Sequence, residues 1–383
     1  MTPIYSHQIY SSASQLPENW NDLAIATIFL SKEYLAILEK SAPANMSCHF
    51  IGLFENETLV GIALSQFVDL NQLESFGERD QCIKSSIRNV VFKNFCSHIL
   101  LIGNNTLTGQ NAFVISEKSN QTEVLKTLKK AVLALKDIFK NKGKKVHICG
   151  LKDFCEPELN RFEIPEFNPY LRFSTQPNMI FAVRDEWKTE EDYVAALSKK
   201  YRDQYKRARK KATGLVKRQL SLDEIIAQEE VIYDLYFHVA KSAPFNTFFL
   251  PKNHFAVFKK QLQDNFLFYG YFENDKLIGF NTLIKNGSDL DTYFLGYDDS
   301  IQREKMLYLN MLYDMIGYAI KEQFSSIIFA RTALEIKSSV GAKPLKMYGM
   351  MRHDNKFINS RLNFFFQYLE PETIWTERHP FQD

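Results

Sequence analysis

A twelve-residue segment occurs twice in this chain, and each copy has the pattern of a β-hairpin. FIGLFENETLVG spans Phe50–Gly61 and FYGYFENDKLIG spans Phe268–Gly279, with seven of the twelve positions identical. In each copy two apolar runs flank an Asn followed by an acidic residue, which favours a tight turn between two strands. A glycine ends each copy, and a glycine inside a strand usually marks a bulge or the close approach of another backbone.

Similar elements follow both hairpins in the same order. After the second copy the pattern predicts a strand, a long amphipathic helix and a buried strand, at Leu290–Tyr297, Arg303–Gln323 and Ser325–Ala330. An extra segment of about residues 70–97 follows the first copy. After it, the pattern predicts a strand at His98–Gly103, a second candidate strand at Asn111–Ser116, a helix at Asn120–Lys142 and a buried strand at Lys145–Gly150. This order predicts two copies of one unit of class α/β (α+β).

The length of 383 residues also fits two domains, and a hydrophobic content of 45% is ample for two packed cores. The strand pattern at Pro177–Val183 is expected to close the first half. A helix from Glu190 to Thr213 is expected to begin the second half. We therefore predict an N-terminal domain at residues 1–183 and a C-terminal domain at residues 184–383.

Composition excludes several other classes. The net charge of +2 gives no support for a DNA-binding protein, because only a local cluster of cations could provide it. The five cysteines form no CxxC pair, which argues against a disulfide framework or a zinc site. The N-terminus lacks the pattern of a signal peptide, and no apolar run is long enough to span a membrane. We expect a reduced, cytoplasmic protein that needs no metal.

The order hairpin, strand, long helix and strand resembles the core of the GNAT acyltransferase superfamily. The segment Ala333–Met351 adds a short helix, a glycine step at Gly341-Ala342 and a final strand, as GNAT chains do. Two such units in one chain resemble the FemA/FemX-like branch, which includes peptidoglycan aminoacyl ligases and uncharacterised BioF2-like proteins. The resemblance implies two tandem GNAT-like domains, each with a mixed, mostly antiparallel sheet flanked by helices, and an active site in the second.

The resemblance also implies acetyl-CoA or a longer acyl-CoA as donor. GNAT enzymes carry Q/R-x-x-G-x-G/A before the long helix, where backbone N–H groups cradle the coenzyme A pyrophosphate. The equivalent stretch here, Asp298–Met311, contains no glycine, a departure that FemA-like proteins share. We expect the cofactor-binding residues in and near this stretch to be Arg303, Lys305, Met306, Leu307 and Arg331.

The catalytic candidates lie at strand ends in the second half. Tyr297 ends the central strand and is positioned to protonate a leaving group; the alternative is a tyrosine at the core or rim. Arg331 and Glu335 follow the buried strand, where the ligand crevice of an open α/β sheet lies. If a helix begins at Thr332 they share one face, with Glu335 as base and Arg331 as anion ligand, or they form a structural ion pair. Asp291 and Asp298 are weaker candidates.

A dense run of cations occupies Ser198–Ala212, and an apolar stripe on the same helix predicts packing against a domain. The cations form either a solvated face or an anion-binding surface for tRNA, coenzyme A phosphates or an acidic cell-wall precursor. The predicted substrate-binding residues are Lys200, Arg202, Lys206 and Arg207.

Three functions remain open. The first is an N-acyltransferase that moves an acyl group from acyl-CoA to an amine, either a small molecule or a cell-wall precursor. The second is an aminoacyl-tRNA-dependent, FemA-like ligase acting on a peptidoglycan precursor, although no long helical insertion for tRNA is visible. The third is a non-catalytic binding module on a degenerate fold, which the missing glycine loop motivates.

Overall fold

The computed structural model describes residues 3–72, 97–242, 246–362 and 375–382. The chain forms two compact units. Unit 1 comprises Met1–Thr175, Pro244–Pro251 and Lys346–Glu372, and unit 2 comprises Gln176–Ala243, Lys252–Leu345 and Thr373–Asp383. Most of the extra segment predicted at residues 70–97 lies outside the described residues.

Unit 1 is built on a mixed sheet. Its strands are β1 (Tyr5–Tyr10), β2 (Met46–Glu55), β3 (Thr58–Asp69), β4 (His98–Ile102), β5 (Phe113–Ile115), β6 (Ile148–Phe154) and the end of β13 (Lys343–His353). Neighbouring strands follow the order β1-β2-β3-β4-β6-β13, in which only β4 and β6 are parallel, and β5 pairs with β3. Its helices are α1 (Trp20–Leu23), α2 (Lys32–Ser41), α4 (Gln121–Asn141), α5 (Glu156–Leu159) and α14 (Lys356–Asn359).

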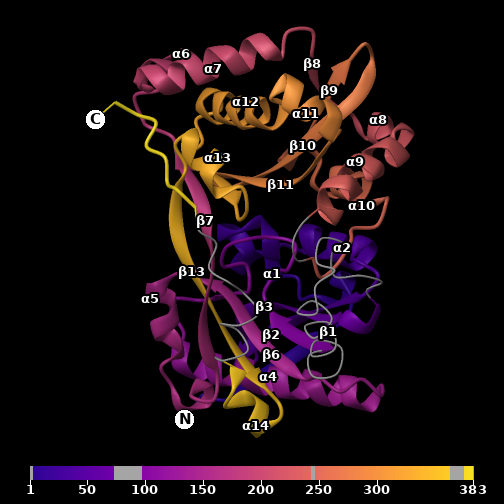
Figure 1. The fold of residues 1–383 in the computed structure, drawn as a ribbon. Coiled ribbons are helices and arrows are strands. Elements are labelled where there is room, and N and C mark those ends of the chain that lie inside the picture. The colour runs from indigo at the N-terminus through magenta and orange to yellow at the C-terminus, as the bar shows by residue number, and fades with distance from the viewer. Residues whose placement is uncertain (1–2, 73–96, 243–245, 363–374, 383) are drawn as a thin grey trace. The chain divides into compact units, whose positions relative to one another are not determined.

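Unit 2 repeats this plan. Its strands are β8 (Val216–Gln219), β9 (Phe266–Glu273), β10 (Lys276–Asn286), β11 (Asp289–Tyr297), β12 (Ser326–Ala330) and the end of β7 (Leu171–Ala182). They follow the order β7-β12-β11-β10-β9-β8, and only β11 and β12 are parallel. Its helices are α6 (Glu190–Ala196), α7 (Lys199–Lys211), α8 (Leu222–Ala227), α9 (Glu229–Lys241), α10 (His254–Leu262), α11 (Asp299–Lys305), α12 (Leu307–Lys321) and α13 (Leu334–Ser339) (Figure 1).

Two long strands carry the chain between the units. The segment predicted to close the first half, Pro177–Val183, pairs with β12 of unit 2 and not with β6, so that assignment was wrong. Conversely, Tyr348–His353 near the end of the second half pairs with β6 of unit 1. The division therefore differs from the predicted boundary at residues 183 and 184, because each half of the sequence supplies the last strand of the other unit's sheet.

The duplicated hairpins adopt the same irregular geometry. Both turns have positive φ angles at their two central residues, which are Asn56, Glu57, Asn274 and Asp275. One residue of each second strand, Val60 or Ile278, bulges out of register just before the glycine. The carbonyls of the two bulged residues accept equivalent hydrogen bonds. The N–H of Ser116 donates to Val60 at 2.8 Å, and the N–H of Asp298 donates to Ile278 at 2.9 Å. The repeat thus places a bend at the same point of both sheets.

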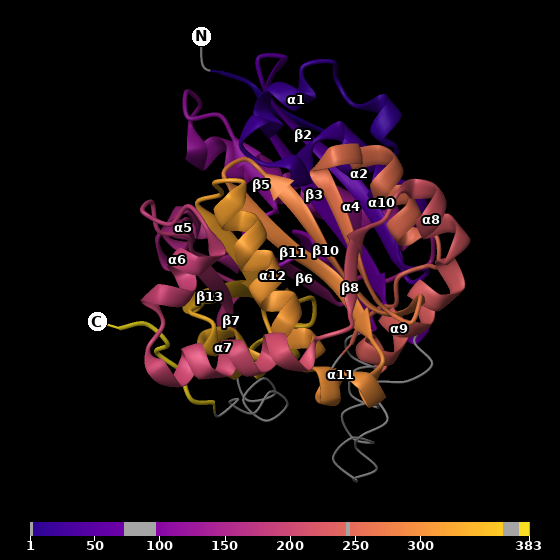
Figure 2. The ribbon, with the colours of Figure 1, turned by 90° about the horizontal axis from the view of Figure 1, so that it is seen from above.

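The glycines after the bulges let a helix approach the sheet closely. A Cβ at Gly61 would lie 3.3 Å from Val124 of α4, and one at Gly279 would lie 2.8 Å from Leu307 of α12. Neighbouring strand residues point to opposite faces, and Phe280 contacts Phe255 of α10. The sheet of unit 2 therefore lies between α12 on one face and α9 with α10 on the other (Figure 2).

Two predicted helices are each divided in the structure. The helix expected over Glu190–Thr213 breaks into α6 and α7, because the N–H of Ser198 donates to Pro380 and an isolated bridge joins Leu197 to Phe381. The helix expected over Arg303–Gln323 breaks into α11 and α12 at Met306, which is left-handed with φ 49°. In the described part of the chain, no helix is both long enough and apolar enough to cross a membrane.

Candidate active site

The strands β11 and β12 part near the middle of β11. They pair only where Asp289–Asp291 face Ser326–Ile328. The next link is a side-chain hydrogen bond, in which Thr292 Oγ1 donates to the carbonyl of Ile328 at 3.0 Å. β11 then continues beside β10, whereas β12 ends beside β7. Since ligands of open α/β sheets bind where neighbouring strands part at their carboxyl ends, this gap is the first candidate for a ligand site.

Asp291 is a buried carboxyl group at the parting point. Its residue is 5% exposed, and Asn286 Nδ2 donates to its Oδ2 at 3.3 Å. Burial raises the pKa of Asp291 to about 7, although the hydrogen bond from Asn286 acts in the opposite direction. A carboxylate with such a pKa is suited to accept a proton near neutral pH. In the sequence Asp291 ranked below Glu335, because the strand pattern does not reveal how deeply this carboxyl is buried.

A buried histidine–tyrosine pair lies further along the same strand. His254 of α10 is fully buried, and its Nε2 lies 2.9 Å from the hydroxyl of Tyr293 on β11. The two rings stack with an interplanar angle of 17°. Sequence reasoning missed this pair, because its members meet only through the packing of α10 on the sheet and no local spacing links them.

Tyr297 stands at the end of β11, where the sequence predicted the end of the central strand. Its ring centroid lies 6.3 Å from that of Tyr308 on α12. Burial raises the pKa of Tyr297, and the nearby Asp299 adds to the effect. Burial also raises the pKa of Tyr308. Tyr297 therefore keeps its proton at neutral pH and can donate it.

The first turn of α12 begins next to this strand. Met306 caps the helix in a left-handed conformation without a side-chain hydrogen bond, so the side chain of Met306 leaves the first-turn N–H groups uncapped. These groups form the positive end of the helix dipole. Leu307 has a fully buried side chain in the core, which leaves only its backbone for a ligand contact.

The turn between β12 and α13 carries backbone strain. Three residues within four positions, Ala330, Thr332 and Ala333, have φ angles of 59°, 66° and 46°. The ammonium of Lys337 donates to the carbonyls of Phe329, Ala330 and Arg331 at 2.6, 3.3 and 2.5 Å and so holds the turn. Burial lowers the pKa of Lys337 to about 7. No sequence pattern pointed to Lys337.

Arg331 and Glu335 do not share a helix face, so that prediction was wrong. The helix α13 begins at Leu334, because the strained turn precedes it. Glu335 is half-exposed and forms an ion pair with Arg378 from the C-terminal segment. Arg331 lies in the strained turn just beyond β12, at the predicted strand end.

No family model matches this sequence, and no curated protein matches it. Among solved structures, FemX is similar with a TM-score of 0.51 and 10% identity, over 95% of this chain and 100% of that one. The chain has a tandem GNAT, FemX-like fold. A tandem GNAT protein from the clavulanic acid biosynthesis pathway also has a TM-score of 0.51, with 8% identity over 92% of this chain and 99% of that one. A putative lysylphosphatidylglycerol synthetase from Agrobacterium fabrum matches through its C-terminal domain, with a TM-score of 0.51 and 8% identity over 93% and 98%.

In this GNAT fold, α11 occupies the place of the glycine loop. Asp298 caps α11 by accepting from the N–H of Ser300 at 2.9 Å, and this contact with Ser300 lowers the pKa of Asp298. Lys305 is neutralised by Glu273 at 2.7 Å. Arg303 is exposed. The glycine cradle itself is therefore absent from this described stretch.

The basic helix α7 is hydrogen-bonded to the start of α12. Asn310 of α12 donates to the carbonyl of Ala208 at 3.0 Å. Arg209 is held by ion pairs with Glu190 and with Asp314, the latter at 2.6 Å. Within the described part of the chain, six exposed cations of α7 have no carboxylate partner: Lys199, Lys200, Lys206, Arg207, Lys210 and Lys211.

Arg202, the fourth predicted substrate-binding residue, differs from this group. It is half-buried, and its Nη1 donates to the carbonyl of Ala195 at 3.2 Å. The structure therefore leaves Lys200, Lys206 and Arg207 of the predicted set on the open cationic face.

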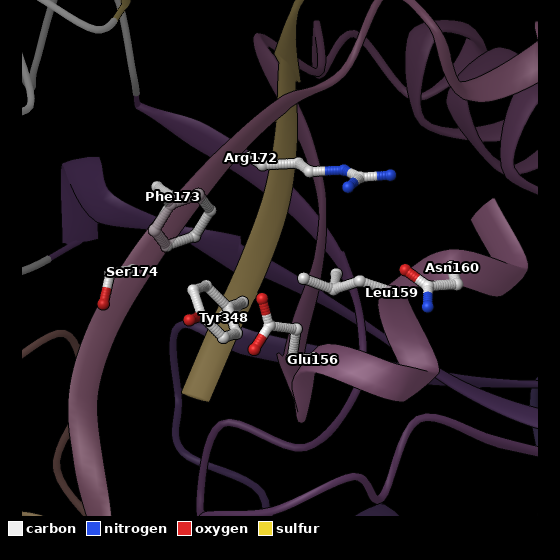
Figure 3. A pocket seen from close by; sticks show the side chains of 7 residues that line it. All are labelled: Glu156, Leu159, Asn160, Arg172, Phe173, Ser174 and Tyr348. Carbon is white, nitrogen blue, oxygen red and sulfur yellow. The ribbon is translucent and has the colours of Figure 1, made fainter. Parts of the chain in front are cut away.

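A surface pocket of about 260 Å³ lies in unit 1, and none of the predicted site residues lines it (Figure 3). Its lining combines one guanidinium, one carboxylate and neutral polar and apolar groups, from Glu156, Leu159, Asn160, Arg172, Phe173, Ser174 and Tyr348. The guanidinium is held at the rim by Glu163, which accepts from Arg172 Nη2 at 3.3 Å. Among the described residues no group of His, Cys, Asp and Glu side chains is arranged to hold a metal ion.

Proposed function

We propose that this chain is an N-acyltransferase that binds its acyl donor in unit 2, where β11 parts from β12. The proposal rests on the end of the pairing between β11 and β12, because beyond it one edge of β11 has no β12 partner next to the start of α12. The donor is acetyl-CoA or a longer acyl-CoA. The acceptor is an amine of a small molecule or of a cell-wall precursor.

Three groups along β11 supply the chemistry. The amine nitrogen attacks the thioester carbonyl, so that a C–N bond forms and the C–S bond breaks. Asp291, with its pKa raised to about 7, takes the proton that the amine loses. The departing thiolate takes a proton from water, and Tyr297, which lies six residues or about 20 Å further along β11 than Asp291, contacts the donor near the start of α12. Backbone N–H groups of β11 beyond Thr292, which lack a β12 partner in the described ladder, are available to the developing oxyanion.

The donor is tested by calorimetric titration of acetyl-CoA and longer acyl-CoAs into the full-length protein. We expect binding in the micromolar range and a several-fold loss in Arg303→Ala, because Arg303 is the exposed cation beside the start of α12. Arg161→Ala removes an exposed arginine of unit 1 and is the matched control. The acyl-CoA form of the proposal fails if none of these donors binds.

The cationic face of α7 favours a second candidate, an aminoacyl-tRNA donor with a peptidoglycan precursor as acceptor. One helix, hydrogen-bonded to the start of α12, carries six exposed cations that have no carboxylate partner in the part of the chain that the structure describes. Such a row neutralises the phosphates of a nucleic acid backbone without reading its sequence. The same donor site would then hold an ester instead of a thioester.

This candidate predicts tRNA binding that weakens steeply with salt. The double variant Lys206→Glu and Arg207→Glu should reduce affinity by about tenfold or more and flatten the salt dependence. The double variant Lys276→Glu and Lys343→Glu makes the same charge change at exposed positions outside α7 and should bind normally. If both double variants bind tRNA with equal affinity, the aminoacyl-tRNA candidate is wrong and the acyl-CoA proposal is unaffected.

A further inference from the structure

Unit 1 contains a buried ammonium group that has no counter-ion among the described residues. Lys129 of α4 is 9% exposed. Its Nζ donates to the hydroxyl of Tyr170 and lies 4.1 Å from the centroid of the Tyr170 ring. An ammonium has three N–H donors, yet in the described part of the chain Tyr170 is the only hydrogen-bond acceptor of Lys129 and no carboxylate pairs with it. An unpaired buried charge is costly, so its retention calls for an anion that is bound some of the time.

Lys129 lines a small hollow at the surface of unit 1, and a second cation, Arg352, lines it as well. Arg352 of β13 lies directly across from Cys149 of β6 in the ladder, and both residues line the hollow together with Lys129. Within the described residues, Arg352 forms no hydrogen bond or ion pair through its guanidinium. Lys136 also lines the hollow, but it is paired with Asp354.

The charges of this hollow leave a surplus of two positive charges. Three cations, Lys129, Lys136 and Arg352, face one carboxylate, Asp354. Burial raises the pKa of the Cys149 thiol and lowers the pKa of His147, so both side chains are neutral near pH 7. A ligand that balances the surplus carries two negative charges. A phosphate monoester does so near pH 7, because its second pKa is about 6.

We propose that unit 1 holds a binding site for the terminal phosphate of a phosphorylated small molecule, between Lys129 and Arg352. The cavity itself measures about 10 Å³, which is room for one water-sized atom. One phosphate oxygen enters it and accepts from Lys129. The other oxygens remain at the mouth, where the planar guanidinium of Arg352 can bind two of them at once.

The site makes binding depend on pH in a defined direction. Burial lowers the pKa of Lys129 to about 8, and Arg352 and Lys136 add to the effect, whereas Cys149 opposes it. The remaining groups at Lys129 are the hydroxyl and ring of Tyr170 and the ring of Phe167. Above about pH 8 the amine loses its charge, so the site loses one of its two unpaired cations and phosphate binding weakens.

The test is calorimetric titration of the full-length protein with inorganic phosphate, glycerol 3-phosphate and acetate. We expect both phosphates to bind at least about tenfold more tightly than acetate, because acetate carries one charge. Lys129→Met and Arg352→Gln should each weaken phosphate binding by about tenfold or more. Lys130→Met removes the neighbouring exposed lysine of α4 and should bind normally. Raising the pH from 7 to 9.5 should weaken binding to the wild type and have little effect on Lys129→Met.

Far-UV circular dichroism and urea unfolding verify that each variant is folded. Arg352 is half-exposed, so Arg352→Gln is expected to fold. This variant therefore still tests the site if Lys129→Met does not fold. Tighter binding of glycerol 3-phosphate than of inorganic phosphate would identify a phosphomonoester as the ligand, and the reverse would identify the free ion. The proposal is overturned if neither phosphate binds at 10 mM, or if Lys130→Met weakens binding as much as Lys129→Met does.

Discussion

At the residue scale, the chemistry proposed for unit 2 depends on buried ionisable groups that the sequence did not distinguish. Tyr297 was predicted from its place at a strand end. Asp291 stood out only after its burial was known, and Lys337 and the His254–Tyr293 pair gave no signal at all. The pKa of each of these groups depends on what packs around it, and a single sequence with no alignment does not contain that information.

Asp291→Asn should stabilise the protein while it slows the reaction. Burial raises the pKa of Asp291 to about 7 from 3.8, so between these values the folded state holds a proton that the unfolded state releases. The contribution of Asp291 to the free energy of unfolding therefore falls as pH rises from about 4 to 7. The variant lacks this loss and should be about 2 kcal/mol more stable at pH 7.5 by urea unfolding.

The same variant should lower kcat by about 100-fold or more and remove the inflection near pH 7 from the pH–rate profile. Asp289→Asn removes the neighbouring carboxyl group, which accepts from Ser326 at 2.7 Å, and should keep the inflection. A wild-type rate and pH profile in Asp291→Asn would assign the proton acceptor to another residue.

At the element scale, the duplicated hairpin is the feature that sequence reasoning predicted best. Turn residues, bulge and closing glycine recur because local backbone geometry needs these residue types. The helices were located well, but their breaks were missed. The break at Met306 depends on Asn310, whose amide donates to the carbonyls of Lys305 and Met306 at 3.1 Å each, and the break at Leu197 depends on the C-terminal segment.

Gly296→Ala should separate α9 from β11. A Cβ at Gly296 would lie 2.5 Å from the backbone of Leu235 and 2.6 Å from that of Tyr236, and backbone atoms cannot yield as flexible side chains do. We expect the free energy of unfolding to fall by about 3 kcal/mol, measured by urea denaturation.

Gly317→Ala is the matched control for that change. Gly317 lies inside α12, and its added Cβ would approach the flexible side chain of Glu190 at 3.0 Å. The gain in helix propensity of about 1 kcal/mol should offset the contact. If Gly296→Ala proves as stable as Gly317→Ala, the close packing of α9 on β11 is wrong.

At the scale of the whole molecule, the two halves of the sequence do not coincide with the two compact units. β6 of unit 1 needs β13 from the far end of the chain, and β12 of unit 2 pairs with β7 from the first half. The predicted boundary at residue 183 missed this exchange, because pairing between distant strands leaves no local pattern.

A fragment of residues 1–183 should therefore fail to fold cooperatively. Without β13, the edge of β6 that faces away from β4 is unpaired and can pair with other chains, which leads to aggregation. We expect low solubility and no sharp unfolding transition by circular dichroism. Mixing with a fragment of residues 184–383 should restore both. A 1–183 fragment that unfolds cooperatively on its own would contradict the exchange of strands.

The proposed function requires that the acyl donor binds where β11 parts from β12. Hydrogen–deuterium exchange of the full-length protein, with saturating acyl-CoA or aminoacyl-tRNA, tests it most directly. We expect slower exchange at residues 292–297 and 307–310, and no change in the twin hairpin at Phe50–Gly61, which serves as the internal control. Unchanged exchange with both donors, or protection confined to unit 1, would show that the donor does not bind between β11 and β12.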